Sequence, residues 1–395
     1  MENYIADWLH LVLRWFHVVA AITWVGSSFY FNKIDRSFRP PEPPVDGVSG
    51  QLWSIHGGAI YNYSRYPLGP GYVPGQLKWS KWESLGTWMS GALLLAVVYW
   101  YGASLNLVSG SADALSPVLA ICVSIFSIVF GWIAYDVTCK QINDERILFA
   151  VLGVLLSGSV WVFFQIFSGK AAFLHVGIVM GTIMAGNVWF VILPGQKRML
   201  KAMADGTIAQ FDVGAEAKKR NYHNNYLTLP VVFAMIGAHF PMVYGHELGW
   251  LAFILISAAG VSVRYFFNTM HAGEAKPIYI AFGAALILAT MFMIAPTPRS
   301  VVSGETSAVT YSQVADILTQ RCVACHAADP SKGGFVEAPP KGLILDAAPA
   351  AIKAAQLVYQ QAVTTHVMPP GNVTEMTDDE RELLRQWIEG GAKAE

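Results

Sequence analysis

Long apolar segments recur along the first three quarters of the chain, separated by shorter polar stretches. Each is close to the roughly 20 residues that an α-helix needs to cross a bilayer. A soluble protein with buried helices would not have so many runs of this length. The pattern predicts eight transmembrane helices, over residues 8–32, 82–102, 115–136, 147–168, 171–193, 226–244, 248–268 and 278–296. Three are less regular, because they contain Glu83, the pair Pro230 and Pro241, and Arg264.

The pattern changes after the last apolar segment. Residues 297–310 are rich in Pro, Ser and Thr and are expected to form a linker. Apolar residues at helical spacing follow over 310–321, and Thr377 with Glu380 predicts a capping box that starts a final helix, stopped by the Gly390-Gly391 pair. The sequence therefore predicts an all-α protein with a membrane domain (1–296), a linker and a small helical domain (311–395).

Composition agrees with this class. Of the 395 residues, 54% are hydrophobic and only 13% are charged, and the net charge is −1. A bilayer is the expected surrounding, and nucleic acid has no basic patch to bind.

The loops predict an orientation. Fifteen Lys and Arg side chains fall in the loops on one side and only Lys170 on the other. Positively charged loops stay in the cytoplasm. Both termini and the small domain should therefore face outward, into the periplasm if the membrane is the bacterial cytoplasmic one. The opening "MENYIAD" has no basic region, so no cleavable signal peptide is expected.

An internal similarity links the first and fifth predicted helices. Residues 17–34 and 175–192 align with one inserted residue, so that His17 meets His175 and Gly26 meets Gly186. The third and seventh segments also align. This predicts two four-helix halves, each contributing one histidine inside the membrane.

Cys322, Cys325 and His326 form C-x-x-C-H, the signature of a covalently attached c-type haem. A zinc site would need a second ligand pair, and the other cysteines, Cys122 and Cys139, lie far upstream. A thioredoxin-like redox pair would need a strand–helix context that is missing. His326 is therefore the expected axial ligand of a haem iron.

The second axial ligand is expected from "HVMPPGN", residues 366–372. Met368, followed by two prolines and a glycine, suits a stiff loop that holds a thioether against the iron. His366 and Met376 are the alternatives. From Tyr311 onward the chain resembles class I cytochrome c domains in these motifs.

Histidines inside the membrane segments are candidate ligands of a second, non-covalent haem. Intramembrane ionisable residues are costly and are functional candidates by default. His17 and His175 could ligate a haem b from opposite faces, with His239 as a substitute. The alternative is that each imidazole hydrogen-bonds a neighbouring helix. His10 and His246 are expected at the solvated outer interface. No H-x-H occurs, which excludes a haem–copper oxidase.

The large inner loops carry polar clusters that could line one cavity open to the cytoplasm. The candidate residues are His56, Arg65, Glu83, His223, Asn224 and Asn225. Glu83, His223 and His56 are the candidate catalytic proton acceptors, and Arg65, Asn224 and Asn225 the candidate substrate contacts. For Arg65 and the lysines, the alternative is a role in the positive-inside girdle.

Three stretches extend a resemblance to the whole chain: "IHGGAIY", "KWESLGTWMSG" and "MAGNVWF". With the predicted spans and the C-terminal haem motif, they resemble bacterial membrane-bound urate oxidases with a fused cytochrome c domain. The resemblance implies oxidation of urate to 5-hydroxyisourate. Electrons would leave through the cytochrome to the respiratory chain, by way of an external soluble cytochrome c or a terminal oxidase, without hydrogen peroxide.

Two other functions remain open on the sequence. The chain could be a quinol-to-cytochrome electron-transfer module with no organic substrate, or a membrane anchor for a cytochrome. Eight helices with buried histidines exceed what an anchor needs. Reduction of the haem by urate without quinol separates the first reading from both others.

Overall fold

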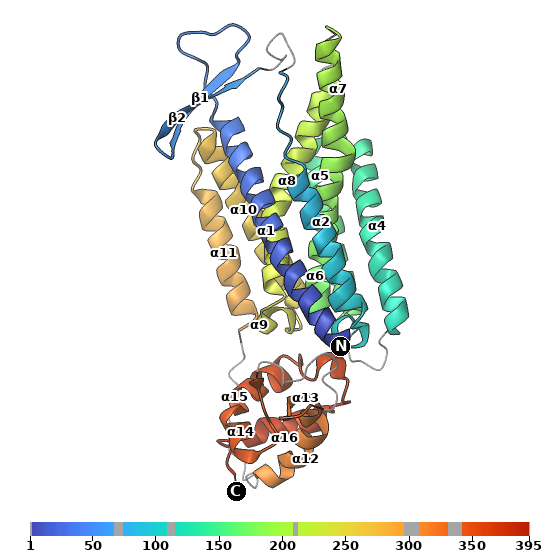
Figure 1. The fold of residues 1–395 in the computed structure, drawn as a ribbon. Helices are drawn as coiled ribbons and strands as arrows, with labels where there is room; N and C mark the ends of the chain where they lie inside the picture. Colours follow the sequence, from blue (N-terminus) through green and yellow to red (C-terminus); the bar gives the residue numbers. More distant parts are fainter. Residues whose placement is uncertain are drawn as a thin grey trace.

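The computed structural model describes residues 2–66, 74–108, 115–207, 212–295, 309–330 and 342–394. These residues form an elongated bundle of long helices, with a smaller helical lobe at one end (Figure 1). Both chain termini lie at the end of the bundle where the lobe sits. The predicted linker, 297–310, lies almost wholly outside the described residues.

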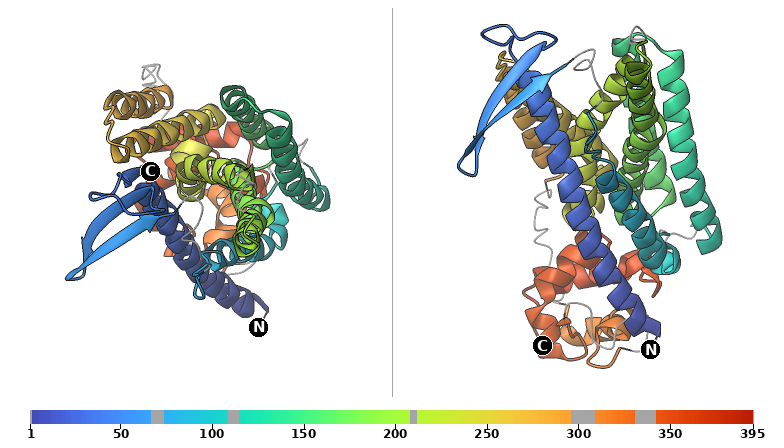
Figure 2. Two further views of the ribbon diagram at one scale, coloured as in Figure 1. Left: turned by 90° about the horizontal axis from the view of Figure 1, so that it is seen from above. Right: turned by 45° about the horizontal axis from the view of Figure 1, so that its top comes forward.

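The bundle contains the following elements: α1 (Glu2–Ser37), α2 (Trp82–Leu94) continued by η1 (Leu95–Trp100), α3 (Ala103–Asn106), α4 (Pro117–Gln141), α5 (Glu145–Ile166), α6 (Gly169–Gly186) continued by η2 (Asn187–Ile192) and α7 (Leu193–Ala204), α8 (Asp212–Gly237), α9 (Pro241–Tyr244), α10 (Gly249–His271) and α11 (Ile278–Met293). Their long members run roughly parallel and antiparallel to one another (Figures 1 and 2).

Within the described residues, five helices are long and apolar enough to cross a membrane: 8–37 in α1, α4, α5, the continuous rod 169–204 and α10. The predicted spans at 82–102, 226–244 and 278–296 fall on helices that do not reach this standard in the described residues. α11 is apolar but short. α8 begins with a charged stretch, and α2 changes to a π-helix after Leu94. These three spans remain predictions.

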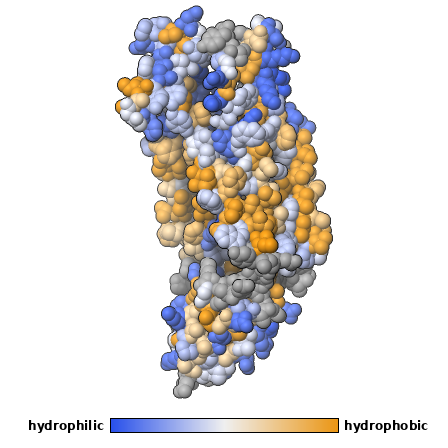
Figure 3. Space-filling model, viewed as in Figure 1, coloured by the Kyte–Doolittle hydropathy of each residue, from blue (hydrophilic) through white to orange (hydrophobic). Residues whose placement is uncertain are grey.

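The outside of the bundle is apolar, as expected of a membrane protein. Trp15, Ile22, Phe126 and Phe130 are large side chains on α1 and α4, and all are exposed. Figure 3 shows hydrophobic side chains gathered around the middle of the bundle, whereas hydrophilic ones gather at the end away from the lobe. Exposed apolar surface of this extent fits a lipid surrounding.

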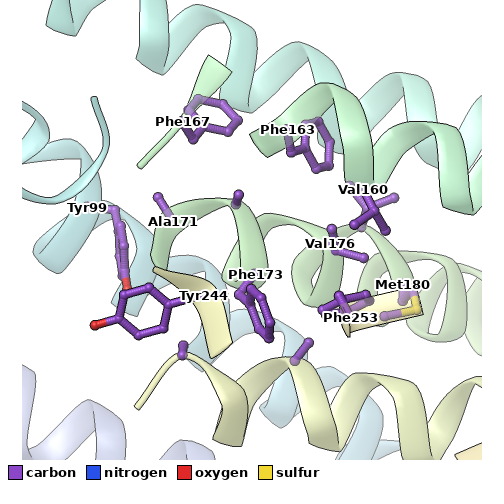
Figure 4. Close-up of a cluster of buried hydrophobic side chains, with 14 of the residues drawn as sticks. Tyr99, Val160, Phe163, Phe167, Ala171, Phe173, Val176, Met180, Tyr244 and Phe253 are labelled. Carbon is purple, nitrogen blue, oxygen red and sulfur yellow. The ribbon is translucent and has the colours of Figure 1, made fainter. Parts of the chain in front are cut away.

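The core of the bundle is centred on α6. Most of its side chains are buried, and small residues such as Ala171 and Ala172 let neighbouring helices come close. Phe173 packs against Phe253 of α10 with ring centroids 4.9 Å apart, and Phe167 lies nearby (Figure 4). Gly186 lies against Trp132: a Cβ here would meet the indole at 2.6 Å, so glycine is required.

The loop after α1 forms a β-hairpin. This is a departure from the all-α fold that the sequence predicts. β1 (Gly50–His56) pairs antiparallel with β2 (Ala59–Arg65), and His56 faces Ala59 across the turn. Gly57 and Gly58 both have positive φ, 58° and 80°, which a two-residue hairpin turn of this kind demands. The Gly57-Gly58 pair was the sequence signal that could have predicted this turn. The hairpin projects from the end of the bundle that lies away from the lobe (Figures 1 and 2).

The lobe contains α12 (Tyr311–Arg321), α13 (Val323–His326), α14 (Ala348–Lys353), α15 (Ala355–Val358), η4 (Tyr359–Thr364), η5 (Pro370–Asn372) and α16 (Asp378–Glu389). The predicted capping box of Thr377 and Glu380 is confirmed, and α16 ends with Gly390 as its C-cap. α12 and α16 pack against each other, with the Tyr311 and Trp387 rings 5.8 Å apart.

Glu380 links α16, on which it lies, to α12. Its carboxylate accepts from Arg321 Nε at 3.0 Å and from the Thr377 N–H at 2.7 Å. Burial raises the pKa of the Glu380 carboxyl, but the Arg321 guanidinium and the Thr377 hydrogen bonds outweigh it and hold the pKa below its usual 4.5. The folded lobe therefore favours the ionised carboxylate.

We expect the lobe to lose this stabilisation in acid. Because the unfolded chain protonates Glu380 at a higher pH than the folded chain does, the contribution is complete above pH 4.5 and falls as the pH drops through 4.5 toward the folded value. Hydrogen exchange of the α16 amides, corrected for intrinsic rates, should report this loss. In Glu380→Gln that pH step should be absent, and a step of unchanged size in the variant would contradict the assignment.

Candidate active site and redox centre

The C-x-x-C-H motif occupies one helical turn. The N–H groups of Cys325 and His326 both donate to the Cys322 carbonyl oxygen, at 3.1 and 2.9 Å. Nδ1 of His326 lies 3.1 Å from the carbonyl oxygen of Leu343, which can only accept, so Nδ1 carries the proton. Nε2 keeps its lone pair, and metal-ligating histidines are anchored in this way. The donor set therefore fits a covalent haem.

Cys322 packs against the lobe core. Burial raises the pKa of the Cys322 thiol to about 11, so it is not a thiolate at neutral pH. Redox-active C-x-x-C pairs work through a cysteine whose pKa is lowered. Cys322 thus lacks the lowered pKa that the reactive cysteine of such a pair needs.

Met368 lies in a fixed loop. Its N–H donates to the Gln361 carbonyl oxygen at 2.9 Å, and buried Arg381 donates to its carbonyl oxygen at 2.8 Å. Of its two alternatives, Met376 is only 3% exposed within the lobe core, and His366 is exposed. Met368 is half-buried and remains the expected second ligand.

The Met368 loop contacts the end of the bundle that lies next to the lobe. Val367 packs against the bundle core, and η5 contacts α3. Gly245 approaches Thr365 so closely that a Cβ on this glycine would lie 2.9 Å from the Thr365 Cβ. The loop with the expected haem ligand is therefore also the contact between the lobe and the bundle.

His17 of α1 faces α2. Its Nδ1 lies 3.0 Å from both the Thr87 carbonyl oxygen and Ser90 Oγ. Since a carbonyl oxygen can only accept, Nδ1 carries the proton and Nε2 is the lone-pair nitrogen. This tautomer suits a haem ligand.

His175 of α6 is completely buried, and both ring nitrogens have partners. Nδ1 donates to the Ala171 carbonyl oxygen at 2.8 Å, Nε2 accepts from Ser124 Oγ at 2.7 Å, and the ring stacks on Phe167 at 4.3 Å. The substitute ligand, His239, is exposed beyond the end of α8. A haem iron would have to displace Ser124, so His175 as placed does not fit a ligand role.

The outer-interface histidines differ in their surroundings. His246 accepts a hydrogen bond from the Leu248 N–H at 3.0 Å and so caps its own loop. His10 is half-buried on α1. Both lie toward the lobe end, as predicted, but neither is freely solvated.

His223 of α8 belongs to a buried polar network. Asn187 Nδ2 donates to the Tyr135 hydroxyl oxygen at 2.9 Å, and that hydroxyl lies 2.6 Å from His223 Nδ1. The Tyr135 O–H therefore donates to His223. Asn187 also donates to Asn224 Oδ1 at 2.8 Å. The predicted residues His223 and Asn224 thus lie in one network.

Arg220 anchors this network. It is 0% exposed, and it pairs with Asp136 at 2.9 Å and with Glu216 at 2.7 Å. Its guanidinium carbon lies 5.1 Å from the centroid of the Tyr135 ring. Arg220 was expected only as an inner-loop charge, whereas the structure places it inside the bundle.

The remaining inner-loop candidates do not join the buried network. His56 is exposed beside the hairpin turn. Arg65 pairs with Asp35 at 3.3 Å and lies over the Phe38 ring, as part of the hairpin base. Glu83, in the first turn of α2, has a buried carboxylate oxygen, Oε2, without a hydrogen-bond partner. The six predicted residues therefore do not line one common cavity.

Asn225 lies in a second polar cluster, with α10. Its Oδ1 accepts from Arg264 Nε at 3.0 Å and from Asn268 Nδ2 at 2.8 Å. Arg264 and Asn268 were missed as functional candidates. The signal was present, because an arginine inside a predicted span is a functional candidate by default, yet Arg264 was considered only as an irregularity of that span.

Comparison with known proteins gives one match. A family model described as urate oxidase N-terminal matches residues 3–295, which cover the whole helical bundle. No curated protein matches the chain, and no solved structure matches it.

Proposed function

We propose, since the chain belongs to the urate oxidase N-terminal family, that it oxidises urate within the helical bundle and passes the electrons to a haem c on the lobe. The product would be 5-hydroxyisourate. Urate and one water give this product with the release of two electrons and two protons, so the reaction needs an electron acceptor and proton acceptors but no oxygen.

One observation carries the proposal: the family match and the haem motif occur on a single chain. The match ends at residue 295, and the C-x-x-C-H turn begins at Cys322 in the adjoining lobe. A covalent haem would accept electrons one at a time. The loop that holds Met368 touches the bundle through Val367, which gives a short route between the two parts.

His223 and Glu83 are the proposed proton acceptors. The Tyr135 hydroxyl directs its proton at His223 Nδ1 across 2.6 Å, so a proton can move from the Tyr135 hydroxyl to His223 when that hydroxyl takes up another. Glu83 offers a buried carboxylate oxygen without a partner. Asn224 holds Asn187, and with it the Tyr135 hydroxyl. His56 and Arg65 have no role in this proposal, because they lie on the hairpin.

The proposed location is the bacterial cytoplasmic membrane, with the polar clusters on the cytoplasmic side and the lobe in the periplasm. A soluble cytochrome c or a terminal oxidase would take electrons from the lobe. The second haem stays a prediction, and no step here passes through it, because His175 as placed does not fit.

The decisive experiment is anaerobic addition of urate to the purified full-length chain without quinol. We expect the haem absorption to change to its reduced form, with one urate consumed for every two electrons accepted. Dithionite gives the total reducible haem as the control. If a quinol reduced the haem and urate did not, the chain would be an electron-transfer module instead.

A further inference from the structure

A second polar cluster lies at the inner end of the bundle, away from the His223 network. Asn225 (α8), Arg264 and Asn268 (α10) are 0%, 4% and 1% exposed. Asn224 and Asn225 are consecutive on α8, so they leave the helix about 100° apart and enter different clusters. Both amide atoms of Asn224 have hydrogen-bond partners: Oδ1 accepts from Asn187 Nδ2, and Nδ2 donates to the Met184 carbonyl oxygen.

The Asn225 cluster, in contrast, is incomplete. Asn225 Nδ2, Arg264 Nη2 and Asn268 Oδ1 are all buried, and none of them has a hydrogen-bond partner among the residues that the structure describes. An unsatisfied buried polar atom is destabilising, because it has given up its hydrogen bonds to water and gained none in return. Three such atoms on three touching side chains are hard to explain as packing alone, and they present two donors and one acceptor.

The cluster carries positive charge without a counter-ion. The Arg264 guanidinium carbon lies 4.1 Å from the centroid of the Phe29 ring of α1, which fixes its plane. Arg36 follows Phe29 on α1 by about two helical turns. It lies over the Tyr222 ring, and its buried Nε has no partner among the described residues. Within the described part of the chain, neither arginine forms a salt bridge.

One face of α10 leads from the cluster toward the inner end of the bundle. Arg264, Asn268 and His271 are spaced by four and three residues, so they share this face. His271 is the last residue of α10, and its Nδ1 is also buried without a partner. The unpartnered groups therefore run from the buried cluster to the helix end.

We infer that Asn225, Arg264 and Asn268 bind the planar anion of an oxopurine, with Phe29 holding Arg264 in position. Carbonyl oxygens of such an anion would accept from Arg264 Nη2 and Asn225 Nδ2, and a ring N–H would donate to Asn268 Oδ1. An inorganic anion without a proton, such as chloride or sulfate, offers no such donor. This inference rests on the proposed function, because urate is the oxopurine anion it names.

The test is equilibrium binding of radiolabelled urate to the full-length chain in nanodiscs, with the haem already reduced by dithionite so that no turnover occurs. Arg264→Gln removes the charge, and Asn268→Asp is nearly isosteric but places a carboxylate toward the anion. For Arg264→Gln, loss of one charged hydrogen bond predicts a weakening of about 10- to 100-fold. For Asn268→Asp, repulsion between the new carboxylate and the bound anion should weaken binding in the same direction. In oxidised protein the KM for urate should rise by a similar factor.

Ser262→Ala is the matched control on α10. Its hydroxyl donates to the Tyr279 carbonyl oxygen on α11, so urate binding should be unchanged. Wild-type affinity in both Arg264→Gln and Asn268→Asp would overturn the site. The proposed function would survive that result if urate still reduced the haem, and it would fail by itself if wild-type haem stayed oxidised.

A measurement on the wild type covers the case in which the variants do not fold. Urate should slow hydrogen exchange in peptides covering residues 222–229 and 262–271 more than in the control helix α5, which supplies no residue to either polar cluster. Protection elsewhere, with none in these peptides, would overturn the site assignment.

Discussion

A chain with alanine at both Cys322 and Cys325 is expected to lose all covalently bound haem. The two thiols are the only cysteines in the lobe, since Cys122 and Cys139 lie on α4. Haem staining of a denaturing gel should fall to background. Urate-dependent electron transfer should disappear with it, whereas urate binding to the bundle should persist because the polar clusters lie at the opposite end.

Cys122→Ala is the control for the loss of a thiol as such. Cys122 is exposed on α4, so its replacement should leave covalent haem and activity unchanged. Covalent haem that survived in the double variant would show that these cysteines do not attach it. Pigment extracted from the double variant also tests the second haem, because only a non-covalent haem could remain.

Replacing Arg220 with Met should have the largest effect on stability. The guanidinium is 0% exposed and neutralises Asp136 within the bundle. Removing one partner of a buried ion pair costs up to about 3–5 kcal/mol, and here the exposed Lys140 compensates the remaining Asp136 charge only in part. The midpoint of unfolding in a denaturing-detergent titration should fall accordingly, and the His223 network should lose its anchor.

Lys140→Met gives a matched comparison. Lys140 pairs with the same Asp136, at 2.6 Å, but its side chain is 67% exposed. An exposed pair contributes about 0–1 kcal/mol, so this variant should be close to wild type. In Arg220→Met with Asp136→Asn, the loss should be smaller than the sum of the single losses. Equal effects of Arg220→Met and Lys140→Met would refute the buried-pair explanation.

The histidines illustrate how far sequence reasoning reached. An imidazole inside an apolar segment identifies a candidate but not its partners. His175 and His17 occupy matching places in the internal repeat, yet His175 has both nitrogens occupied by Ser124 and Ala171, whereas His17 uses Nδ1. The partners belong to other helices or to the preceding turn, and helix packing decides which side chains meet.

Asn224 and Asn225 make the same point on the substrate side. Both were predicted as substrate contacts from one polar stretch. One turned out to be satisfied by Asn187 and Met184, and the other to share Arg264 and Asn268. A rotation of about 100° between consecutive helix positions separates them, and no local pattern reveals what each side faces.

The sequence by itself determined the helical membrane bundle, the C-x-x-C-H turn and the capped last helix. These features depend on apolar segment length, on the spacing of three residues and on local capping, which are all encoded within short stretches. Only the tertiary structure decided that Arg220 and Arg264 lie buried, that Arg65 and His56 belong to a projecting hairpin, and that Asn225 Nδ2 has no hydrogen-bond partner among the described residues. Burial and hydrogen-bond satisfaction depend on residues distant in the chain, so they appear only when the helices are packed together.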